Sequence, residues 1–347
     1  MLGLMVAGGM ALIVAVFCTP VLRRWLVANS IGQYIRDDGP SMHRAKEGTP
    51  TMGGIVLFAA LCVGYFVAHM VTSVRMSADG VLVVGLVVAF GLIGLIDDWL
   101  KVHNKRNLGL NKRAKFASQV AVALLFAVGS EKFGHASTFL SFTRWNSTGV
   151  NLGSIGWIVW VALIVVGSSN AVNLTDGLDG LAAGSLALVF AVLAIIGYWQ
   201  FRHFSIYRVS SSLDLSLVAV ALAGACVGFL WWNAAPARIF MGDTGSLAMG
   251  SGLAGIAILM NLQLLLPILG GLFVIVTLSV VVQVISFRIF KRRLLKMAPL
   301  HHHFELSGWP ESTVIVRFWI MAGLFAAFGL GLFYADYLSV TRLLSKA

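Results

Sequence analysis

Long uninterrupted apolar runs are the feature that most constrains this chain. A membrane-spanning helix needs about 20 apolar residues, and the chain holds ten runs near that length. They are continuously apolar and do not alternate with polar residues, which argues against a strand barrel. We therefore expect one all-α polytopic membrane domain over 1–347, with about ten transmembrane helices over 1–22, 55–74, 81–96, 116–130, 155–175, 180–201, 215–237, 244–262, 266–287 and 318–335. The eighth and ninth runs are continuous, and Pro267 divides them because proline ends or kinks a helix.

The composition supports the same class. Apolar residues make up 59% and charged residues 11% of the chain, against about 45–50% and about 25% in soluble proteins. This excludes a soluble multidomain enzyme and a disordered chain. The three cysteines, Cys18, Cys62 and Cys226, are far apart and predict neither a disulfide framework nor a zinc site. The net charge of +11 fits the basic flanks that orient membrane proteins, so no nucleic acid partner is expected.

The distribution of Lys and Arg predicts the orientation. Of the 25 basic residues, 18 fall in 23–54, 97–115, 233–243 and 288–317, and the other 7 fall on the opposite side of the expected bundle. Basic residues concentrate in cytoplasmic loops. We therefore expect these four segments in the cytoplasm, and both termini on the outer side.

The acidic residues gather on the same basic side, which solubility alone does not require. The acids expected there or at its membrane boundary are Asp37, Asp38, Glu47, Asp97, Asp98, Asp176, Asp179, Asp243, Glu305 and Glu311. Carboxylates on a basic face suit a metal ion together with an anionic substrate. We therefore expect the active site on the cytoplasmic face.

Three polar motifs carry most of this expectation. Asp97 and Asp98 end the third apolar run, where negative charge is unfavourable; the alternative is a solvated helix end paired with Lys101. In 170–180, acids and amides recur at intervals of three between two spans, and the alternative is a capped helix–loop–helix. Asp243 lies in a Gly-Asp-x-Gly-Ser turn before a helix, which suits phosphate and Mg²⁺, or simple helix capping.

Two further motifs are weaker. The histidines of 299–305 lack helical metal-ligand spacing and suit donation to phosphate or substrate carbonyls, or else form a solvated loop. The segment 43–54 holds Lys46 near a Gly- and Pro-rich turn, and the alternative is an ordinary basic flank. All five motifs are predicted on one face, which favours a single site.

Five sequence segments then suggest a family: GTPTMGG at 48–54, LIDDWLK at 95–101, NLTDGLDGL at 173–181, FMGDTGSLA at 240–248 and PLHHHFE at 299–305. In this combination, over essentially the whole chain, the sequence resembles the polyprenyl-phosphate N-acetylhexosamine-1-phosphate transferase superfamily. It is most similar to the phospho-N-acetylmuramoyl-pentapeptide transferase branch.

This resemblance implies a reaction and a location. The expected donor is UDP-MurNAc-pentapeptide, the acceptor is undecaprenyl phosphate, the products are lipid I and UMP, and the cofactor is Mg²⁺. The expected setting is the lipid bilayer of the bacterial inner (cytoplasmic) membrane, as a multi-pass protein of peptidoglycan synthesis. Family members tend to be dimers, so a homodimer is also implied.

The resemblance also implies residue roles. Asp243 is the expected Mg²⁺ ligand, and Asp97 orients or deprotonates the lipid phosphate, or carries the phosphoryl group covalently, with Asp98 in support. The implied substrate-binding residues are Lys46, Thr51, Asn173, Asp176, Asp179, Phe240, Gln283, His302 and His303. Among them, Phe240 would stack on uracil and Asp179 would accept its imide hydrogen. Gln283, His302 and His303 would lie near the sugar–peptide part.

Two other functions remain open at this point. A sister transferase would move GlcNAc-1-phosphate by the same chemistry, although 48–54 and 299–305 argue against it. An ion-coupled transporter would also place acids in a membrane bundle, but such sites tend to lie near the midplane within internal repeats. The acids here are predicted at one boundary, and no convincing repeat is present.

Overall fold

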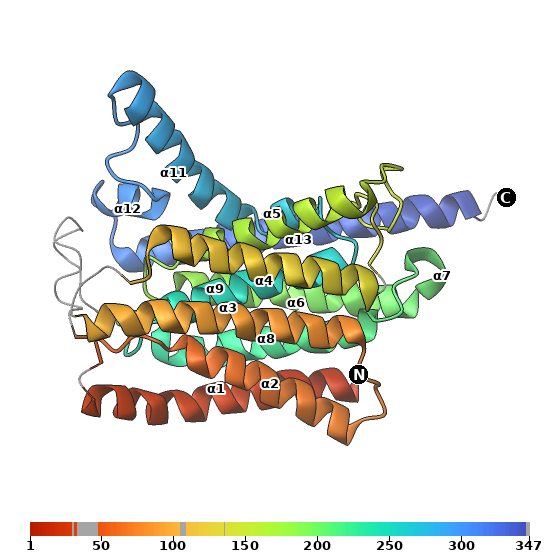
Figure 1. Cartoon of the computed structure of the whole chain (residues 1–347), viewed down its shortest axis with the longest axis horizontal. Helices are drawn as coiled ribbons and strands as arrows, with labels where there is room; N and C mark the ends of the chain where they lie inside the picture. The colour runs from red at the N-terminus through yellow and green to blue at the C-terminus, as the bar shows by residue number, and fades with distance from the viewer. Residues whose placement is uncertain (30, 33–47, 105–108, 135, 345–347) are drawn as a thin grey trace.

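The computed structural model describes residues 1–29, 31–32, 48–104, 109–134 and 136–344 (Figure 1). Within these ranges the regular structure is helical, apart from one isolated bridge between Phe139 and Asn151. The all-α class is thus confirmed. The helices are α1 (Leu2–Ala28), α2 (Gly54–Val71), α3 (Ala78–His103), α4 (Lys112–Lys132), α5 (Gly153–Thr175), α6 (Leu181–Arg202), α7 (Phe204–Tyr207), α8 (Ser212–Asn233), α9 (Gly242–Leu259), α10 (Leu266–Leu269), α11 (Gly271–Phe290), α12 (Leu300–Glu305) and α13 (Glu311–Leu344).

In the described part of the chain, nine helices are long and apolar enough to cross a membrane: α1 to α6, α8, α11 and α13. The remaining expected span, 244–262, corresponds to α9, which is not among the nine. Every residue of α9 from Thr244 to Leu259 is buried, and the helix contacts α2, α3, α5, α6 and α8. It is therefore the interior helix of a polytopic bundle. Its Gly and Ser content suits close packing between helices.

Several helices extend beyond the expected apolar runs. We expected spans over 81–96, 116–130 and 318–335, whereas α3, α4 and α13 contain 26, 21 and 34 residues. The i to i−4 hydrogen bonds of a helix continue through charged flanks, which hydropathy alone does not count. The expected break at Pro267 is confirmed, because α9 ends at Leu259 and the proline lies in the short α10.

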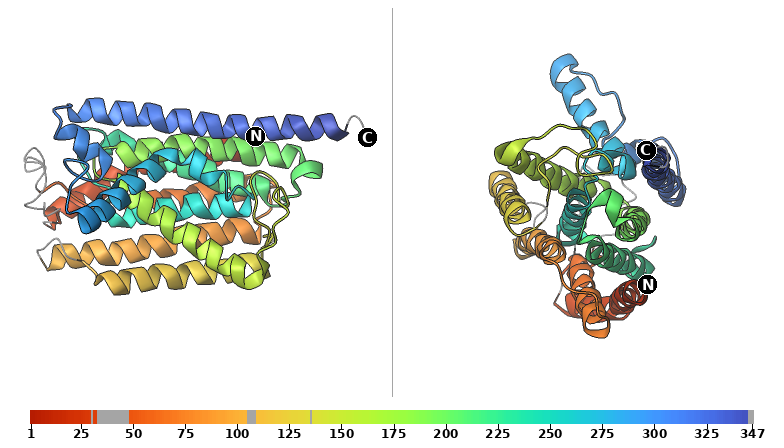
Figure 2. Two further views of the ribbon diagram at one scale, coloured as in Figure 1. Left: turned by 90° about the horizontal axis from the view of Figure 1, so that it is seen from above. Right: turned by 90° about the vertical axis from the view of Figure 1, so that its right-hand side faces the viewer.

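The long helices run side by side, and α11 leans away from the others (Figures 1 and 2). α1 begins and α13 ends toward one end of the bundle, which we call the far end. α3 ends and α9 begins at the other end, which we call the acid end, because Asp97, Asp98 and Asp243 lie there.

Glycines allow main chains to meet at the acid end. A Cβ atom on Gly94 of α3 would lie 2.2 Å from the carbonyl oxygen of Asp243, and one on Gly54 of α2 would lie 2.0 Å from the amide nitrogen of Gly245. Any larger residue would push these helices apart. The first turn of α9 is therefore held directly against the backbones of α2 and α3.

Candidate active site

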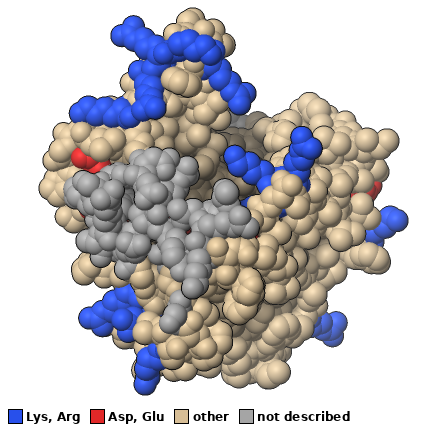
Figure 3. Space-filling view, turned by 60° about the vertical axis from the view of Figure 1, so that its left-hand side comes forward, with Lys and Arg blue, Asp and Glu red and all other residues tan. Residues whose placement is uncertain are grey.

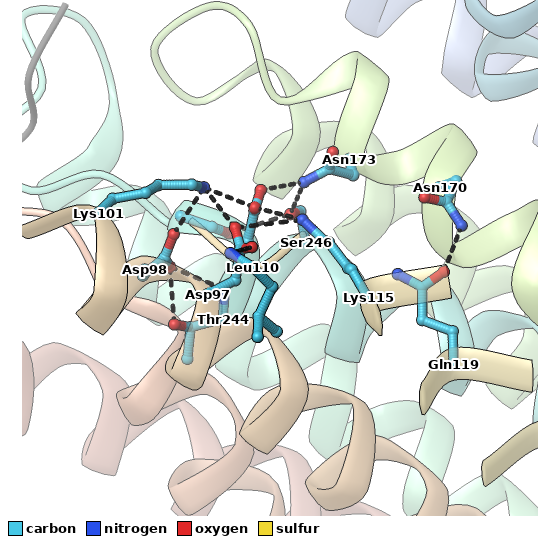
Figure 4. A network of polar contacts seen from close by, with 12 residues as sticks. Asp97, Asp98, Lys101, Leu110, Lys115, Gln119, Asn170, Asn173, Thr244 and Ser246 are labelled. Atoms are coloured by element: carbon cyan, nitrogen blue, oxygen red, sulfur yellow. Dashed lines mark hydrogen bonds and ion pairs between the residues drawn. The ribbon is translucent and has the colours of Figure 1, made fainter. Parts of the chain in front are cut away.

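Three carboxylates from distant parts of the sequence meet at the acid end (Figure 4). Asp97 and Asp98 belong to the last two turns of α3, and Asp243 belongs to the first turn of α9. One oxygen atom from each lies within 4.8 Å of the others. Asp97 and Asp98 are only 2% and 3% exposed. The expected convergence of these acids is thus present in the structure.

Two lysines neutralise most of this charge. The ammonium group of Lys101 lies 2.7 Å from Asp97 Oδ2, 3.2 Å from Asp98 Oδ1 and 2.6 Å from Asp243 Oδ2. Lys115, in the first turn of α4, lies 2.5 Å from Asp243 Oδ2 and 3.3 Å from Asp97 Oδ2. Their side chains are 30% and 20% exposed. With all three carboxylates ionised, the two ammonium groups leave the cluster with one negative charge.

Fixed donors orient Asp97 and Asp98. The amide of Leu110 donates to Asp97 Oδ1 over 2.8 Å. Thr244 donates to Asp98 Oδ2 from its amide over 3.0 Å and from its hydroxyl over 2.8 Å. These backbone amides cannot change position by a side-chain rotation, so they are fixed donors. Each carboxylate therefore has one oxygen held in place and one that faces an ammonium group.

An amide from α5 orients Asp243. Asn173 Nδ2 donates to Asp243 Oδ1 over 2.5 Å and to Ser246 Oγ over 2.8 Å. Asp243 Oδ2 faces the two lysines. The oxygens that face Lys101 and Lys115 are hard ligands on three separate side chains, and Mg²⁺ favours oxygen ligands. This donor set fits a divalent cation that displaces the ammonium groups.

The loop after α5 places two further acids close to the cluster. Asp176 is partly buried, and this burial, followed by the charge of Asp243 and other nearby carboxylates, raises its pKa to about 8. Asp179 is buried, and its Oδ2 accepts a hydrogen bond from the amide of Ala237 over 2.9 Å. Its own amide donates to Glu311 Oε1 over 3.2 Å. These bonds tie the loop to the α8–α9 connection and to α13.

The segment 48–53 before α2, which we call the α2 entry loop, pairs with the chain before α9. The amide of Phe240 donates to the carbonyl of Pro50 over 2.8 Å, and the amide of Gly53 donates to the carbonyl of Phe240 over 2.9 Å. Thr51 is buried between these contacts. This pairing holds the segment of Thr51 beside Phe240, which precedes Asp243 by three residues. Lys46, the other candidate from this motif, lies outside the described residues.

The histidine segment forms the short helix α12. His301 is fully buried, and a Cβ atom on Gly177 would lie 2.3 Å from its Nε2. His302 Nδ1 lies 2.7 Å from Glu305 Oε2, and His303 Nδ1 accepts a hydrogen bond from the amide of Lys296 over 3.1 Å. The histidine that touches the Asp176 loop is therefore His301, which was not among the expected site residues.

Both the oxygen and the nitrogen of the Gln283 side-chain amide bind backbone atoms of the segment after α11. Its Oε1 accepts hydrogen bonds from the amides of Leu294 and Leu295, and its Nε2 donates to the carbonyl of Leu295 over 3.0 Å. The side chain therefore holds the segment that follows α11 against the helix. Its expected place near the substrate stays a prediction.

Sequence reasoning missed several residues of this network. Lys101 was considered only as a helix-end partner, although its spacing of three and four from the two acids puts it on their side of α3. Thr244 and Ser246 lie inside the matched motif and were not singled out. Lys115 carries no local signal, because only the packing of α4 beside α3 brings it to Asp243.

Comparisons with known proteins identify the family of the chain. The family model described as glycosyl transferase family 4 matches residues 80–261, and signature 1 of phospho-N-acetylmuramoyl-pentapeptide-transferase matches residues 46–58. Relatives named phospho-N-acetylmuramoyl-pentapeptide-transferase include one from Frankia alni, 51% identical over 98% of this chain and 99% of its own length. Another from Saccharopolyspora erythraea is 49% identical over 99% of both chains, and one from Streptomyces avermitilis is 47% identical over 95% of this chain and 97% of its own. The chain therefore belongs to the phospho-N-acetylmuramoyl-pentapeptide-transferase family.

Proposed function

We propose that this protein transfers phospho-MurNAc-pentapeptide from UDP-MurNAc-pentapeptide to undecaprenyl phosphate in peptidoglycan synthesis. A phosphate oxygen of the acceptor forms a bond to the β-phosphorus of the donor, the bond from that phosphorus to the bridging oxygen breaks, and UMP leaves with this oxygen. The products are lipid I and UMP. The observation that carries the proposal is the cluster of Asp97, Asp98 and Asp243 with two lysines, in a chain related over its full length to named transferases.

Asp243 is the residue that would hold Mg²⁺, with Asp97 and Asp98 within reach of the same ion. When bound, the cation would neutralise the negative charge of the donor's diphosphate. Lys101 and Lys115 reach the same oxygens. Once displaced, their ammonium groups bind the donor or acceptor phosphates and stabilise the charge that develops during transfer.

Asp97 would orient the acceptor phosphate. A phosphate monoester has its second pKa near 6, so the attacking dianion is available at neutral pH without a strong base. Positioning and electrostatics then supply most of the rate gain. The fixed contact from Leu110 to Asp97 Oδ1 leaves Oδ2 as the oxygen that meets a mobile partner.

The nucleoside would lie over the α2 entry loop and the loop after α5. Phe240 stacks on uracil, and Asp179 accepts its imide hydrogen, since a carboxylate oxygen accepts more than one hydrogen bond. The other members of the substrate set are Lys46, Thr51, Asn173 and Asp176 on the nucleotide side, and Gln283, His302 and His303 toward the sugar–peptide part.

The acid end would face the cytoplasm of a bacterium, and both termini would lie outside its inner membrane. The distribution of 18 and 7 basic residues supports this orientation. Figure 3, turned toward the acid end, shows Lys and Arg at several places on the surface and few Asp or Glu. The protein would act as a homodimer, as its resemblance implies.

Release of UMP by the purified protein tests the proposal. The detergent-solubilised protein receives undecaprenyl phosphate and either UDP-MurNAc-pentapeptide or UDP-GlcNAc, with Mg²⁺ or with a chelator. We expect UMP only with the muramoyl donor, the lipid acceptor and Mg²⁺ together. UMP from UDP-GlcNAc alone would indicate the sister transferase. No UMP from either donor would reject the transferase reaction and leave the transporter.

A further inference from the structure

A second pair of polar side chains lies one helical turn from the acid cluster. Gln119 follows Lys115 by four residues on α4, and Asn170 precedes Asn173 by three residues on α5, so each pair shares a helix face. Lys115 and Asn173 both bond Asp243. Gln119 and Asn170 bond each other on the same two faces (Figure 4).

The orientation of the Gln119 amide follows from its neighbours. Asn170 Nδ2 donates to the carbonyl oxygen of Val166 over 2.8 Å and to Gln119 Oε1 over 2.8 Å. The carbonyl of Val166 only accepts hydrogen bonds, so Asn170 must turn its NH₂ group toward it. Gln119 must then present its oxygen to Asn170. Its own NH₂ group consequently points the other way, toward the side on which Lys115 lies (Figure 4).

The NH₂ group of Gln119 is available as a hydrogen-bond donor. Gln119 is 1% exposed, and its Nε2 has no hydrogen-bond partner among the described residues. A buried amide donor left unpaired is unfavourable, and such groups in native proteins usually have a partner. The partner must supply an acceptor atom. The charged group nearest to Gln119 along α4 is the ammonium group of Lys115, which attracts anions.

The position along the bundle indicates which anion. α4 starts at the acid end and runs toward the far end, and four residues of helix rise about 6 Å. Gln119 thus lies deeper in the bundle than Lys115. A nucleotide donor enters from water at the acid end, whereas a polyprenyl phosphate is presented from within the membrane. The deeper donor is therefore on the side of the lipid acceptor.

We propose that Gln119 Nε2 donates a hydrogen bond to a phosphoryl oxygen of the polyprenyl phosphate acceptor, with Asn170 holding the amide in orientation. This inference rests on the proposed function and adds a substrate-binding residue to it. The shared chemistry is a phosphoryl oxygen, which the donor diphosphate also carries, so the test measures both substrates separately.

Two substitutions separate binding from structure. Gln119→Met keeps the volume and removes the amide. Gln119→Glu keeps an oxygen for Asn170 and replaces the NH₂ group by a negative oxygen. A hydrogen bond to a charged group is lost in both, so the acceptor KM rises by about 10- to 100-fold. We expect the larger rise for Gln119→Glu, because it repels phosphate, while the donor KM and kcat at saturating acceptor change by less than about 3-fold.

The matched control is Gln200→Met on α6. Gln200 is also fully buried, and its Nε2 donates to the carbonyl of Met260 over 2.9 Å. We expect this variant to lower the thermal midpoint without changing either KM.

Three outcomes would overturn the inference: an unchanged acceptor KM in both folded variants, a rise in the donor KM alone, or wild-type behaviour of Gln119→Glu. If Gln119→Met does not fold, Gln119→Glu alone decides. Failure of the proposed function is distinguishable, since the unmodified protein would then release no UMP at all.

Discussion

Buried carboxylates lie at both ends of the bundle, but their partners differ in kind. At the far end, Asp214 of α8 is 3% exposed. Its Oδ2 accepts hydrogen bonds from Tyr65 over 3.1 Å, from the amide of Ser77 over 2.7 Å and from the Ser77 hydroxyl over 2.6 Å. Its Oδ1 lies 2.9 Å from His69 Nε2. At the acid end, Asp243 Oδ2 meets two lysine ammonium groups.

Burial and the number of contacts therefore do not distinguish a structural carboxylate, such as Asp214, from a carboxylate of the candidate site, such as Asp243. The partners of Asp214 are a backbone amide and short or rigid side chains of packed helices, so they cannot leave without unfolding α2, α3 and α8 locally. The partners of Asp243 Oδ2 are at the tips of the long, partly exposed side chains of Lys101 and Lys115. These ammonium groups can leave the carboxylate by rotation of the lysine side chains, without a change in the packed helices.

The largest expected difference between the two ends is in catalysis. Asp243→Asn should lower UMP release by about 10³-fold or more, because a metal ligand supplies several kcal/mol of transition-state stabilisation. Its thermal midpoint should stay close to that of the unmodified protein. Asp214→Asn is the matched variant and should keep normal turnover per folded molecule. Equal losses in both variants would end the distinction.

The far end should dominate stability instead. Asp214→Ala leaves Tyr65, Ser77 and His69 without their shared acceptor, and each unsatisfied buried donor costs about 1–3 kcal/mol. We expect the free energy of unfolding to fall by about 2–5 kcal/mol, seen as a lower thermal midpoint in detergent. Asp336→Ala is the control, because Asp336 pairs with a partly exposed Arg144. A smaller loss for Asp214→Ala than for this control would contradict the assignment.

The closely spaced carboxylates at the acid end should make the free energy of unfolding depend on pH. The folded-state pKa of Asp176 is about 8, above the unfolded value of about 3.9. The folded state therefore holds an extra proton between these values, and the free energy of unfolding falls as pH rises from 6 to 8. One pKa unit corresponds to about 1.4 kcal/mol, so the free energy of unfolding should fall by about 2–3 kcal/mol between pH 6 and pH 8 when a chelator is present.

Asp176→Asn should remove this slope, and the two proteins should differ most at pH 8 and above. Thermal midpoints measured at several pH values with a chelator check it. The same slope in both proteins would assign the titration to another group.

The smallest expected effect concerns the exchange of ammonium for metal. Lys101→Met removes one competitor from Asp97, Asp98 and Asp243. A partly exposed ion pair contributes up to about 1 kcal/mol, so Mn²⁺ binding without substrate should tighten by about 2- to 5-fold. Electron paramagnetic resonance of bound Mn²⁺ measures this. Tyr65→Phe, at Asp214, should leave Mn²⁺ binding unchanged, and weaker binding in Lys101→Met would show that the lysine supports the metal site.

The fold was predictable where hydrophobic burial decides it. Apolar runs located every long helix, and Pro267 marked the break before α11. Helix ends were less accurate, since hydrogen bonding carries α3 and α13 through charged residues. The interior position of α9 was not foreseen, because an apolar run with small residues reads equally as a lipid-facing span.

The site was predictable as far as shared location could show it. Acids from α3 and α9 were expected on one face and do meet. Lys115 and Gln119 were not foreseen, because only the packing of α4 against its neighbours brings them near. The contacts of Gln283 could not be predicted either, because nothing in the sequence indicates that its side-chain amide binds the backbone of 294–295.

The seating of α9 on Gly54 and Gly94 has a wider consequence. The spacing between Asp98 and Asp243 is set where main chain touches main chain, with no side chain acting as a spacer. Substitutions among the apolar residues on the outer surface of the bundle should therefore leave the distance between these carboxylates unchanged. A compound that binds Asp98 and Asp243 together would depend on this contact between main chains and not on the lipid-facing side chains.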